Sequence, residues 1–348
     1  MEQAKNIRQS NFELLRIVAM IFIVTHHLIT KGADTCGYMT TYNYNKDGCL
    51  GLFVNGFIVG GVNLFVLISG YFGIKNLIKP LLKMFVDLTV YGIIAYLIGV
   101  TFLGINFSIK GLIHGIDIHN WFVIHFALLV LSAPILEAAL KGKDEKTVGK
   151  WVILLLIVNV IFGFLLGYVN DNGYNYLNFI LLYIIARYIR LIKEKQTILY
   201  VHIRKFGIIY WIMSAMLLAI GFLALYKLGK MPSSIRYFAY NNPLVLFSTF
   251  CIFVVFSSLK FQSKYVNIIA TGMFGVFLMH TPPEIIPLRN KISSSIFLQY
   301  GYLGIFVEVS ILFAILTIIA IPTERQNRLI SKTLHNSFKK FCLNMANR

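Results

Sequence analysis

Ten runs of apolar residues, each long enough to cross a bilayer, follow one another along this chain. A membrane-spanning helix needs about 20 such residues, because its backbone must hydrogen-bond within itself in the hydrocarbon. The runs cover approximately residues 12–29, 50–72, 81–103, 121–140, 151–169, 176–192, 206–226, 244–259, 266–282 and 302–321. They predict an all-α, polytopic membrane protein in which about ten transmembrane helices form one bundle.

The composition agrees with a chain that lies almost entirely in a membrane. Of its 348 residues, 57% are hydrophobic and 13% are charged, whereas soluble domains have about 25% charged residues. We therefore expect one transmembrane domain over residues 1–322. Residues 323–348 mix apolar side chains with Lys and Arg, and this pattern predicts a basic amphipathic tail on the cytoplasmic surface of the membrane. Its apolar members are Leu329, Ile330, Leu334, Phe338 and Phe341.

The positive charge of the chain is concentrated in alternate loops. There are 32 Lys and Arg against 14 Asp and Glu, a formal net charge of +18. If ten spans follow a cytoplasmic N-terminus, 23 of these cations lie in inner segments and 8 in outer segments, as the positive-inside rule requires. We therefore expect a multi-pass protein of the cytoplasmic membrane with both termini in the cytoplasm. The excess charge is a topology signal, and we expect no nucleic-acid partner.

Two groups of side chains in the predicted outer loops have metal-binding or redox chemistry. Cys36 and Cys49 lie in the first outer loop, where they can form a disulfide or remain two separate thiols. His114, Asp117 and His119 have spacings that can ligate zinc, but no clear fourth ligand accompanies them. We expect these three residues to belong to a solvated loop, and we expect no metal.

Arg16 and His27 project from one face of the first predicted helix. They are eleven residues apart, which at about 100° per residue is three turns plus about 20°. A rise of about 1.5 Å per residue places them roughly 16 Å apart, with Arg16 near the cytoplasm and His27 near the outside. His26 is rotated from His27 by about 100° and is the weaker candidate. Ionisable residues within a membrane span are candidates for a functional site. The alternative is that Arg16 snorkels or pairs with Glu13, and that His27 is an interfacial histidine.

Residues 11–27 and 62–71 resemble two segments of a known family. The first reads NFELLRIVAMIFIVTHH, in which Arg16 is followed by ten residues and then His27. This spacing resembles the opening helix of membrane acyltransferase family 3. The second reads VNLFVLISGY and is similar to the Phe-Phe-x-x-Ser-Gly segment that follows an acidic residue in that family. It departs twice, because Asn63 replaces the usual Asp and Val66 replaces the second Phe.

Two further segments extend the resemblance over essentially the whole chain. The sequence NWF at residues 120–122, leading to Pro134, looks like the family's Trp-Phe span. The sequence GVFLMH at residues 275–280 looks like its Tyr-Leu-x-His segment, with Phe277 in place of Tyr. The Arg-x-x-Arg that many members carry in the third span is missing. The Ser-Gly-Tyr-Phe segment followed by spaced lysines resembles most the branch found in envelope polysaccharide clusters.

The resemblance implies an integral membrane enzyme that transfers an acyl group to a hydroxyl of a carbohydrate. Such transfer needs a base, and His is the side chain best suited to that role near neutral pH. We predict that His27 is this base, or that it first accepts the acyl group itself. His280 is predicted to bind the acceptor or orient His27, and Ser69 to orient a partner side chain. A structural hydrogen bond for His280 and helix packing for Ser69 are the alternatives.

Acetyl-CoA is the acyl donor that the resemblance implies, and its phosphates need cations on the cytoplasmic side. Arg16 suits bidentate phosphate contacts, and Lys79 and Lys83 supply point charges. Lys75, Lys79 and Lys83 recur every four residues and share one helix face, although Pro80 interrupts it. Ordinary positive-inside anchoring explains the same lysines equally well.

The predicted activity is therefore that of an O-acetyltransferase whose acceptor is a cell-surface polysaccharide or its lipid-linked precursor, held among membrane lipids. The alternative is a transporter or flippase for a glycan or another anionic envelope substrate, with the basic residues guiding that substrate. Transporters commonly show internal repeats and Gly or Pro breaks in matching spans. The sequence shows no such paired halves, and we favour the acyltransferase.

Overall fold

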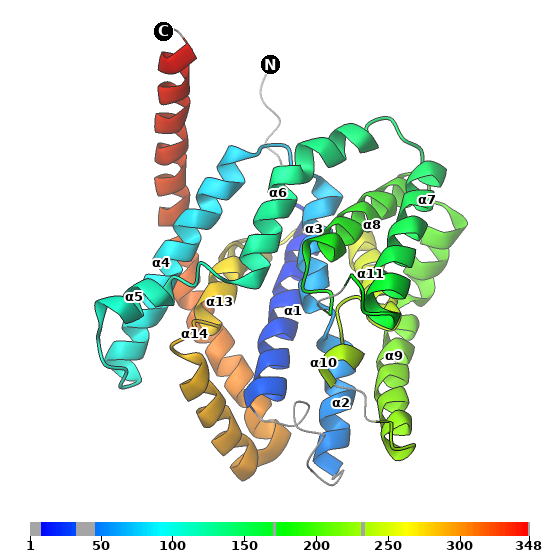
Figure 1. Cartoon of the computed structure of the whole chain (residues 1–348), viewed down its shortest axis with the longest axis horizontal. Helices are drawn as coiled ribbons and strands as arrows, with labels where there is room; N and C mark the ends of the chain where they lie inside the picture. Colours follow the sequence, from blue (N-terminus) through cyan, green and yellow to red (C-terminus); the bar gives the residue numbers. More distant parts are fainter. Residues whose placement is uncertain (1–7, 33–45, 170–171, 231–233, 347–348) are drawn as a thin grey trace.

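The computed structural model of the chain describes residues 8–32, 46–169, 172–230 and 234–346 (Figure 1). Every regular element in these ranges is a helix, and they contain no strand. The prediction of an all-α membrane fold is thereby confirmed.

Each of the ten predicted spans coincides with one, two or three consecutive helices. The first five lie on α1 (Ser10–His27) with the π-helix η1 (Leu28–Gly32), α2 (Lys46–Ile58) with α3 (Gly61–Phe72), α4 (Ile78–Phe102), α6 (Trp121–Leu140), and α7 (Glu145–Leu156) with the π-helix η2 (Ile157–Leu165). The next five lie on α8 (Tyr176–Glu194), α9 (Ile198–Lys227), α11 (Pro243–Ser258), the series α12 (Lys264–Ile269), η3 (Ala270–Gly272) and α13 (Met273–His280), and α14 (Ile286–Ala346). The short helices α5 (Ile109–Gly115) and α10 (Ser234–Tyr237) lie in connections.

Seven helical segments of the described chain are long and apolar enough to cross a membrane. The other three predicted spans differ from these in length, charge or regularity. Helix α8 carries Arg187, Arg190 and Lys193 in its last turns, and α11 has only 16 residues. The ninth predicted span is divided by the 3-10 turn η3. The chain is a membrane protein, and the total of ten spans stays a prediction.

Helix α14 consists of two helical halves joined at Gly301. This residue has φ 60° and ψ −150°, a conformation that glycine adopts far more readily than other residues. The chain therefore folds back on itself there (Figure 1, gold and orange). Beyond the kink the helix continues through Pro322 as far as Ala346, so the predicted tail extends the last span as a helix. The position of that tail on the membrane surface stays a prediction.

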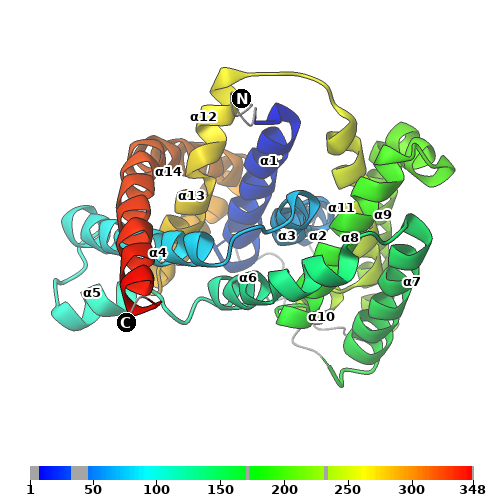
Figure 2. The same cartoon turned by 90° about the horizontal axis from the view of Figure 1, so that it is seen from above.

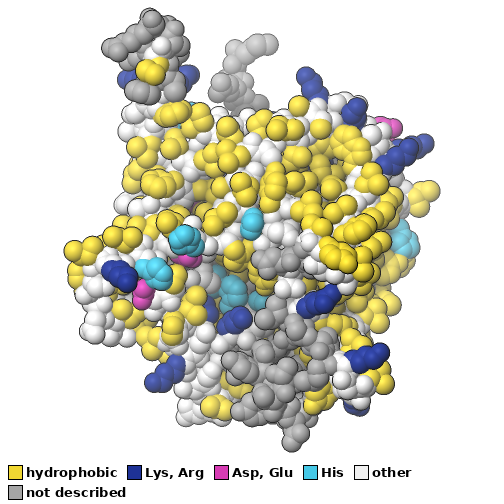
Figure 3. Space-filling view, viewed as in Figure 1, with side chains coloured by type: hydrophobic (Ala, Val, Ile, Leu, Met, Phe, Trp, Pro, Cys, Tyr) yellow, Lys and Arg dark blue, Asp and Glu magenta, His cyan; other side chains and the backbone are white. Residues whose placement is uncertain are grey.

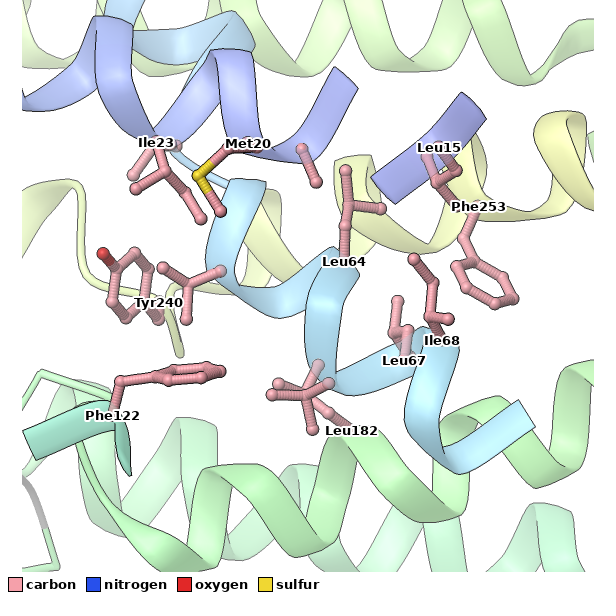
Figure 4. Packing of buried hydrophobic residues seen from close by; sticks show 14 of the residues in the cluster. Leu15, Met20, Ile23, Leu64, Leu67, Ile68, Phe122, Leu182, Tyr240 and Phe253 are labelled. Atoms are coloured by element: carbon pink, nitrogen blue, oxygen red, sulfur yellow. The ribbon is translucent and has the colours of Figure 1, made fainter. Parts of the chain in front are cut away.

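Helix α1 lies in the middle of the bundle (Figure 2). It packs against α12, α13 and α14 on one side and against α2, α3 and α11 on the other. The interface is apolar, and Figure 4 shows buried side chains from α1, α3, α6, α8 and α11 packed together. They include Leu15, Met20 and Ile23 of α1, Leu64, Leu67 and Ile68 of α3, Phe122 of α6, Leu182 of α8 and Phe253 of α11. On the outer surface hydrophobic side chains also predominate (Figure 3), as expected where helices meet lipid.

Polar contacts fix the first turn of α1. The Ser10 hydroxyl donates to Asn267 Oδ1 at 2.9 Å and accepts from the Ser263 backbone N–H at 2.9 Å. The Asn11 side-chain amide donates to the Phe256 carbonyl at 3.0 Å. We call this end of the bundle the Ser10 end and the opposite end of α1 the His27 end. Helix α14 also finishes at the Ser10 end (Figure 1).

Candidate active site

Two histidines from distant parts of the chain meet at the His27 end of the bundle. His27 is the last residue of α1, and His280 is the last residue of α13. His27 Nδ1 lies 2.8 Å from His280 Nε2, and the ring centroids are 5.1 Å apart. His280 is buried, with 3% of its surface exposed. The structure thus joins two of the predicted site residues by a direct hydrogen bond.

The surrounding carbonyls define which nitrogen of each ring carries its proton. His280 Nδ1 lies 2.7 Å from the Phe277 carbonyl oxygen and 3.1 Å from that of Val276. Because carbonyls only accept, His280 Nδ1 is the protonated nitrogen of the neutral ring and its Nε2 is an acceptor. His27 Nδ1 must then donate to His280 Nε2. We assign the tautomers on this network, and they leave His27 Nε2 with a free lone pair, as a base or nucleophile requires.

Arg289 supports the histidine pair from the first half of α14. Its Nη1 donates to the backbone carbonyl of His280 at 2.8 Å, and its Nη2 donates to Asn290 Oδ1 at 2.9 Å. The residue is 9% exposed. In the sequence, Arg289 counts among the cations of an outer loop, so its burial beside His280 was missed. The neighbouring sequence, a Pro-Pro turn, does not indicate a functional site at Arg289.

His26 has a separate partner, as its different direction on the helix predicts. Its Nδ1 donates to Asn55 Oδ1 at 2.6 Å, and Asn55 is buried in α2. The π-helix η1 begins directly after His27. Such π-helical turns occur frequently at functional sites, and this one lies where α1 presents the two imidazoles.

Arg16 lies in a different part of the molecule, nearer the Ser10 end of α1. It lines a cavity of about 280 Å³ together with Ser69 and Lys83. The other walls are formed by α4, α6 and the start of α13, and by Glu324 and Arg328 of α14. His27 does not line this cavity. Phe274 of α13 lines it, and its position six residues before His280 corresponds to roughly 9 Å along a helix. Helix α13 therefore connects the cavity to the histidine pair.

The cations of this cavity are balanced by carboxylates. Arg16 Nη1 lies 2.9 Å from Glu13 Oε2, so the predicted local pairing is present. Lys83 Nζ contacts Asp87 at 2.5 Å and Glu324 at 2.8 Å. Asp87 and Glu324 were missed in the sequence, although Asp87 lies four residues after Lys83 within an apolar run. A charged residue in such a run is itself a signal of a site.

The remaining predicted site residues differ in their surroundings. Ser69 lines the cavity, and its hydroxyl donates to the Phe65 carbonyl of its own helix at 3.3 Å. Gly70 lies against α8, where a Cβ atom would be 2.8 Å from the Cα of Tyr183. Lys79 is exposed and does not line the cavity. The structure thus brings together Arg16, Ser69 and Lys83, and it leaves Lys79 apart.

Two departures from the family pattern occupy structural positions. Asn63 is fully buried, and its side-chain amide donates to the Tyr240 carbonyl at 2.9 Å. Phe277 packs on Phe122, with ring centroids 5.0 Å apart, and its carbonyl oxygen binds His280 Nδ1. The Tyr hydroxyl that is usual at this position is therefore not needed to orient His280.

The polar residues of the predicted outer loops do not form a common site. His114 pairs with Glu284 at 2.9 Å, and Asp117 accepts from Asn120 at 2.9 Å. Burial raises the pKa of Asp117 above its usual value, and the Asn120 hydrogen bond partly opposes this shift. Within the described ranges, no group of three His, Cys, Asp or Glu can hold a metal ion. Cys36 lies outside the described residues, so its pairing with Cys49 stays a prediction.

Comparison with known proteins assigns the chain to a family. The family model for the acyltransferase domain of acyltransferase family 3 matches residues 9–325, a range that includes both histidines, Arg289 and all the cavity-lining residues except Arg328. No curated protein and no solved structure matches the chain. Since the match covers most of the chain, which is helical and rich in apolar spans, the protein belongs to acyltransferase family 3 and is a membrane acyltransferase.

Proposed function

We propose that the protein is an O-acetyltransferase that moves an acetyl group from acetyl-CoA to a hydroxyl of a cell-surface polysaccharide or of its lipid-linked precursor. His27 is the general base in this proposal. The observation that supports it is the hydrogen-bond chain from the Phe277 carbonyl through His280 to His27, which leaves the His27 Nε2 lone pair free.

In the proposed reaction His27 Nε2 acts first as a base and then, once protonated, as an acid. His27 Nε2 removes the hydroxyl proton of the sugar as its oxygen attacks the carbonyl carbon of the thioester. The C–S bond then breaks, and the His27 imidazolium returns its proton to the departing thiolate. The products are the acetylated sugar and CoA. His280 Nε2 accepts from His27 Nδ1 throughout, which stabilises the imidazolium and keeps the ring in one orientation.

A second route uses the same nitrogen as a nucleophile. His27 Nε2 would attack the thioester directly, release CoA and carry the acetyl group to the sugar hydroxyl. The free lone pair serves either route. Rapid acid quenching after mixing with acetyl-CoA alone, followed by mass spectrometry of the peptide that contains His27, distinguishes them, because only the second route adds an acetyl group to that peptide.

Acetyl-CoA is proposed to approach from the cavity at the Ser10 end. Arg16 and Lys83 line that cavity, and in this proposal each exchanges a carboxylate partner for the anionic donor. A volume of about 280 Å³ lies just below the range for small-molecule sites, roughly 300–1,000 Å³. The cavity therefore fits the narrow, uncharged thioester arm. In this proposal the diphosphate lies at the cavity mouth beside the partly exposed side chains of Arg16 and Lys83, and the nucleoside remains outside.

The proposal is tested with purified protein in proteoliposomes, labelled acetyl-CoA and envelope glycan. We expect transfer of the label to the glycan, and we expect His27→Ala to lower kcat by about 10²- to 10⁴-fold. His202→Ala is the matched control, because His202 is exposed on α9 and bonds only to Tyr210 in the described structure. Full activity in folded His27→Ala protein would overturn the assignment of the base. Absence of transfer by the unaltered protein would overturn the proposed function.

A further inference from the structure

An apolar groove lies between the two halves of α14. Its volume is about 620 Å³, and apolar side chains from both halves form its walls. Six of them are Ile292, Ile296, Leu303, Val307, Ile311 and Ile315. Several are largely exposed, Leu303 by 74% and Ile311 by 56%, so the groove opens on the surface of the bundle. In a membrane protein this surface meets hydrocarbon.

One end of the groove is polar and belongs to the candidate active site. His280 and Arg289 both line it, and His280 is the residue that bonds to His27. The Nε atom of Arg289 is buried and has no hydrogen-bond partner among the described residues. A buried guanidinium N–H without an acceptor is costly, and an anion at this end of the groove would satisfy it.

Glu308 is the carboxylate on the groove wall. Its Oε1 accepts from the Ser293 hydroxyl at 2.6 Å, and its Oε2 is buried without a partner in the described part of the chain. It would repel an anion placed against it, and it would accept a hydrogen bond from a hydroxyl. The polar end of the groove therefore offers the Arg289 Nε–H group as a donor for an anion and Glu308 Oε2 as an acceptor for a hydroxyl.

We propose that this groove holds the hydrocarbon chain of an acceptor sugar that is linked to a long-chain lipid phosphate. The chain lies between the halves of α14, the phosphate contacts Arg289, and the sugar extends towards Glu308 and His27. An acetyl group is too small to use such a groove, and a free polysaccharide has no apolar part to occupy it. The inference rests on the proposed function for the identity of the sugar-bearing acceptor, and it selects the lipid-linked precursor over the finished polymer.

Photocrosslinking tests the binding site independently of catalysis. The full-length protein is placed in phosphatidylcholine nanodiscs with polyprenyl phosphate that carries a diazirine in its chain. Mass spectrometry should locate the label within residues 286–315, and unlabelled polyprenyl phosphate should compete for it. Label spread evenly over the membrane-facing helices, or equal competition by phosphatidylglycerol, would show an ordinary lipid surface and overturn the inference.

A paired substitution provides the control. Ile311→Trp fills the groove, whereas Ile161→Trp places the same side chain in a second apolar groove between η2 and α11. Both residues are partly exposed, Ile311 by 56% and Ile161 by 42%, so both variants should fold. We expect Ile311→Trp to weaken probe binding about tenfold, equivalent to the loss of roughly two buried methylenes. Ile161→Trp should leave it unchanged, and equal effects of the two substitutions would contradict the inference.

Transfer assays then separate the inference from the proposed function. One saccharide is presented either free or on polyprenyl phosphate, with labelled acetyl-CoA as donor. Ile311→Trp should raise KM for the lipid-linked form alone. If neither form is acetylated but the groove is still labelled, the proposed function fails and the binding site stands. If both forms are acetylated equally and the groove is not labelled, the inference fails and the proposed function stands.

Discussion

His280 differs from an ordinary buried histidine because both of its ring nitrogens are engaged in a directed chain. Nδ1 is held by carbonyls of its own helix, and Nε2 is held by His27. We therefore regard His280 as a positioning residue. His280→Phe should lower kcat on the order of 10²-fold without changing KM for acetyl-CoA, as a transfer assay over donor concentrations would measure.

The substitution His280→Gln tests whether hydrogen bonding or packing is responsible. A Gln side chain can place its amide oxygen near the position of His280 Nε2 and so retains an acceptor for His27 Nδ1. This variant should recover part of the activity that Phe abolishes. If the Gln and Phe variants are equally impaired, or if KM rises in both, the positioning role is wrong.

Arg16 is the ion-pair partner of Glu13, and in the proposed function it is also a cation for the donor. Arg16→Gln should raise KM for acetyl-CoA about tenfold, because a charge-assisted contact with an anion contributes roughly 1.5–3 kcal/mol. The variant Glu13→Gln with Arg16→Gln removes both charges of the pair and leaves no unpaired carboxylate. It should show the same raised KM, measured by initial rates. Recovery of normal KM in the double variant would show that Arg16 only neutralises Glu13.

The sequence identifies Arg16 and His27 because both interrupt an apolar run and share one helix face. It does not identify Arg289, which follows a turn and has the same local context as any loop cation. Only the return of α14 towards α13 buries it beside His280. The burial of Arg289 depends on tertiary packing, so the local sequence does not predict it.

At the scale of helices, Gly70 sets the distance between α3 and α8. A Cβ there would lie 2.8 Å from both the Cα and the carbonyl oxygen of Tyr183, and backbone atoms cannot easily move aside. We expect Gly70→Ala to lower the free energy of unfolding by about 1–3 kcal/mol, as overpacking does. The thermal unfolding midpoint of detergent-solubilised protein measures this loss.

Ser69→Ala is the matched control on the preceding residue. The Ser69 hydroxyl bonds to the Phe65 carbonyl of its own helix, so its removal should change stability by less than about 0.5 kcal/mol. A Gly70→Ala protein as stable as the Ser69→Ala protein would show that the two helices can separate without cost.

The apolar runs predict where helices lie, and all ten runs coincide with helices. They do not predict how regular those helices are. Residues 266–282 form one apolar run, yet η3 interrupts the helix before Met273. Gly272 lies against Ala320 of α14, so the interruption occurs where two helices pack closely. The kink at Gly301 likewise follows from the return of α14, which periodicity does not reveal.

At the scale of the molecule, the arrangement of the helix ends gives a testable topology. Lys143 follows α6 and Lys110 lies in α5, near opposite ends of α6, and both are exposed. If the Ser10 end faces the cytoplasm, Lys110→Cys in a cysteine-free background should react with an impermeant maleimide in intact cells. Lys143→Cys should react only after the membrane is opened. Labelling of both, or the reverse pattern, would contradict the orientation.

The overall class and the family follow from the sequence, because apolar runs and ordered motifs are local features. The contact between His27 and His280 does not, since nothing in either segment specifies the other. It depends on α13 packing beside α1. The resemblance predicted that His280 binds the acceptor or orients His27. The structure places the two imidazole nitrogens 2.8 Å apart, and the role of His280 stays a prediction.

That contact also has a consequence for how the enzyme is made. The two histidines are 253 residues apart, and a chain is synthesised at roughly 5–20 residues per second. The first helix therefore enters the membrane on the order of ten to fifty seconds before its partner exists. During that interval His27 has no imidazole to hold its ring in position. Newly made protein should remain inert towards cellular acetyl donors until its ninth apolar run has been inserted.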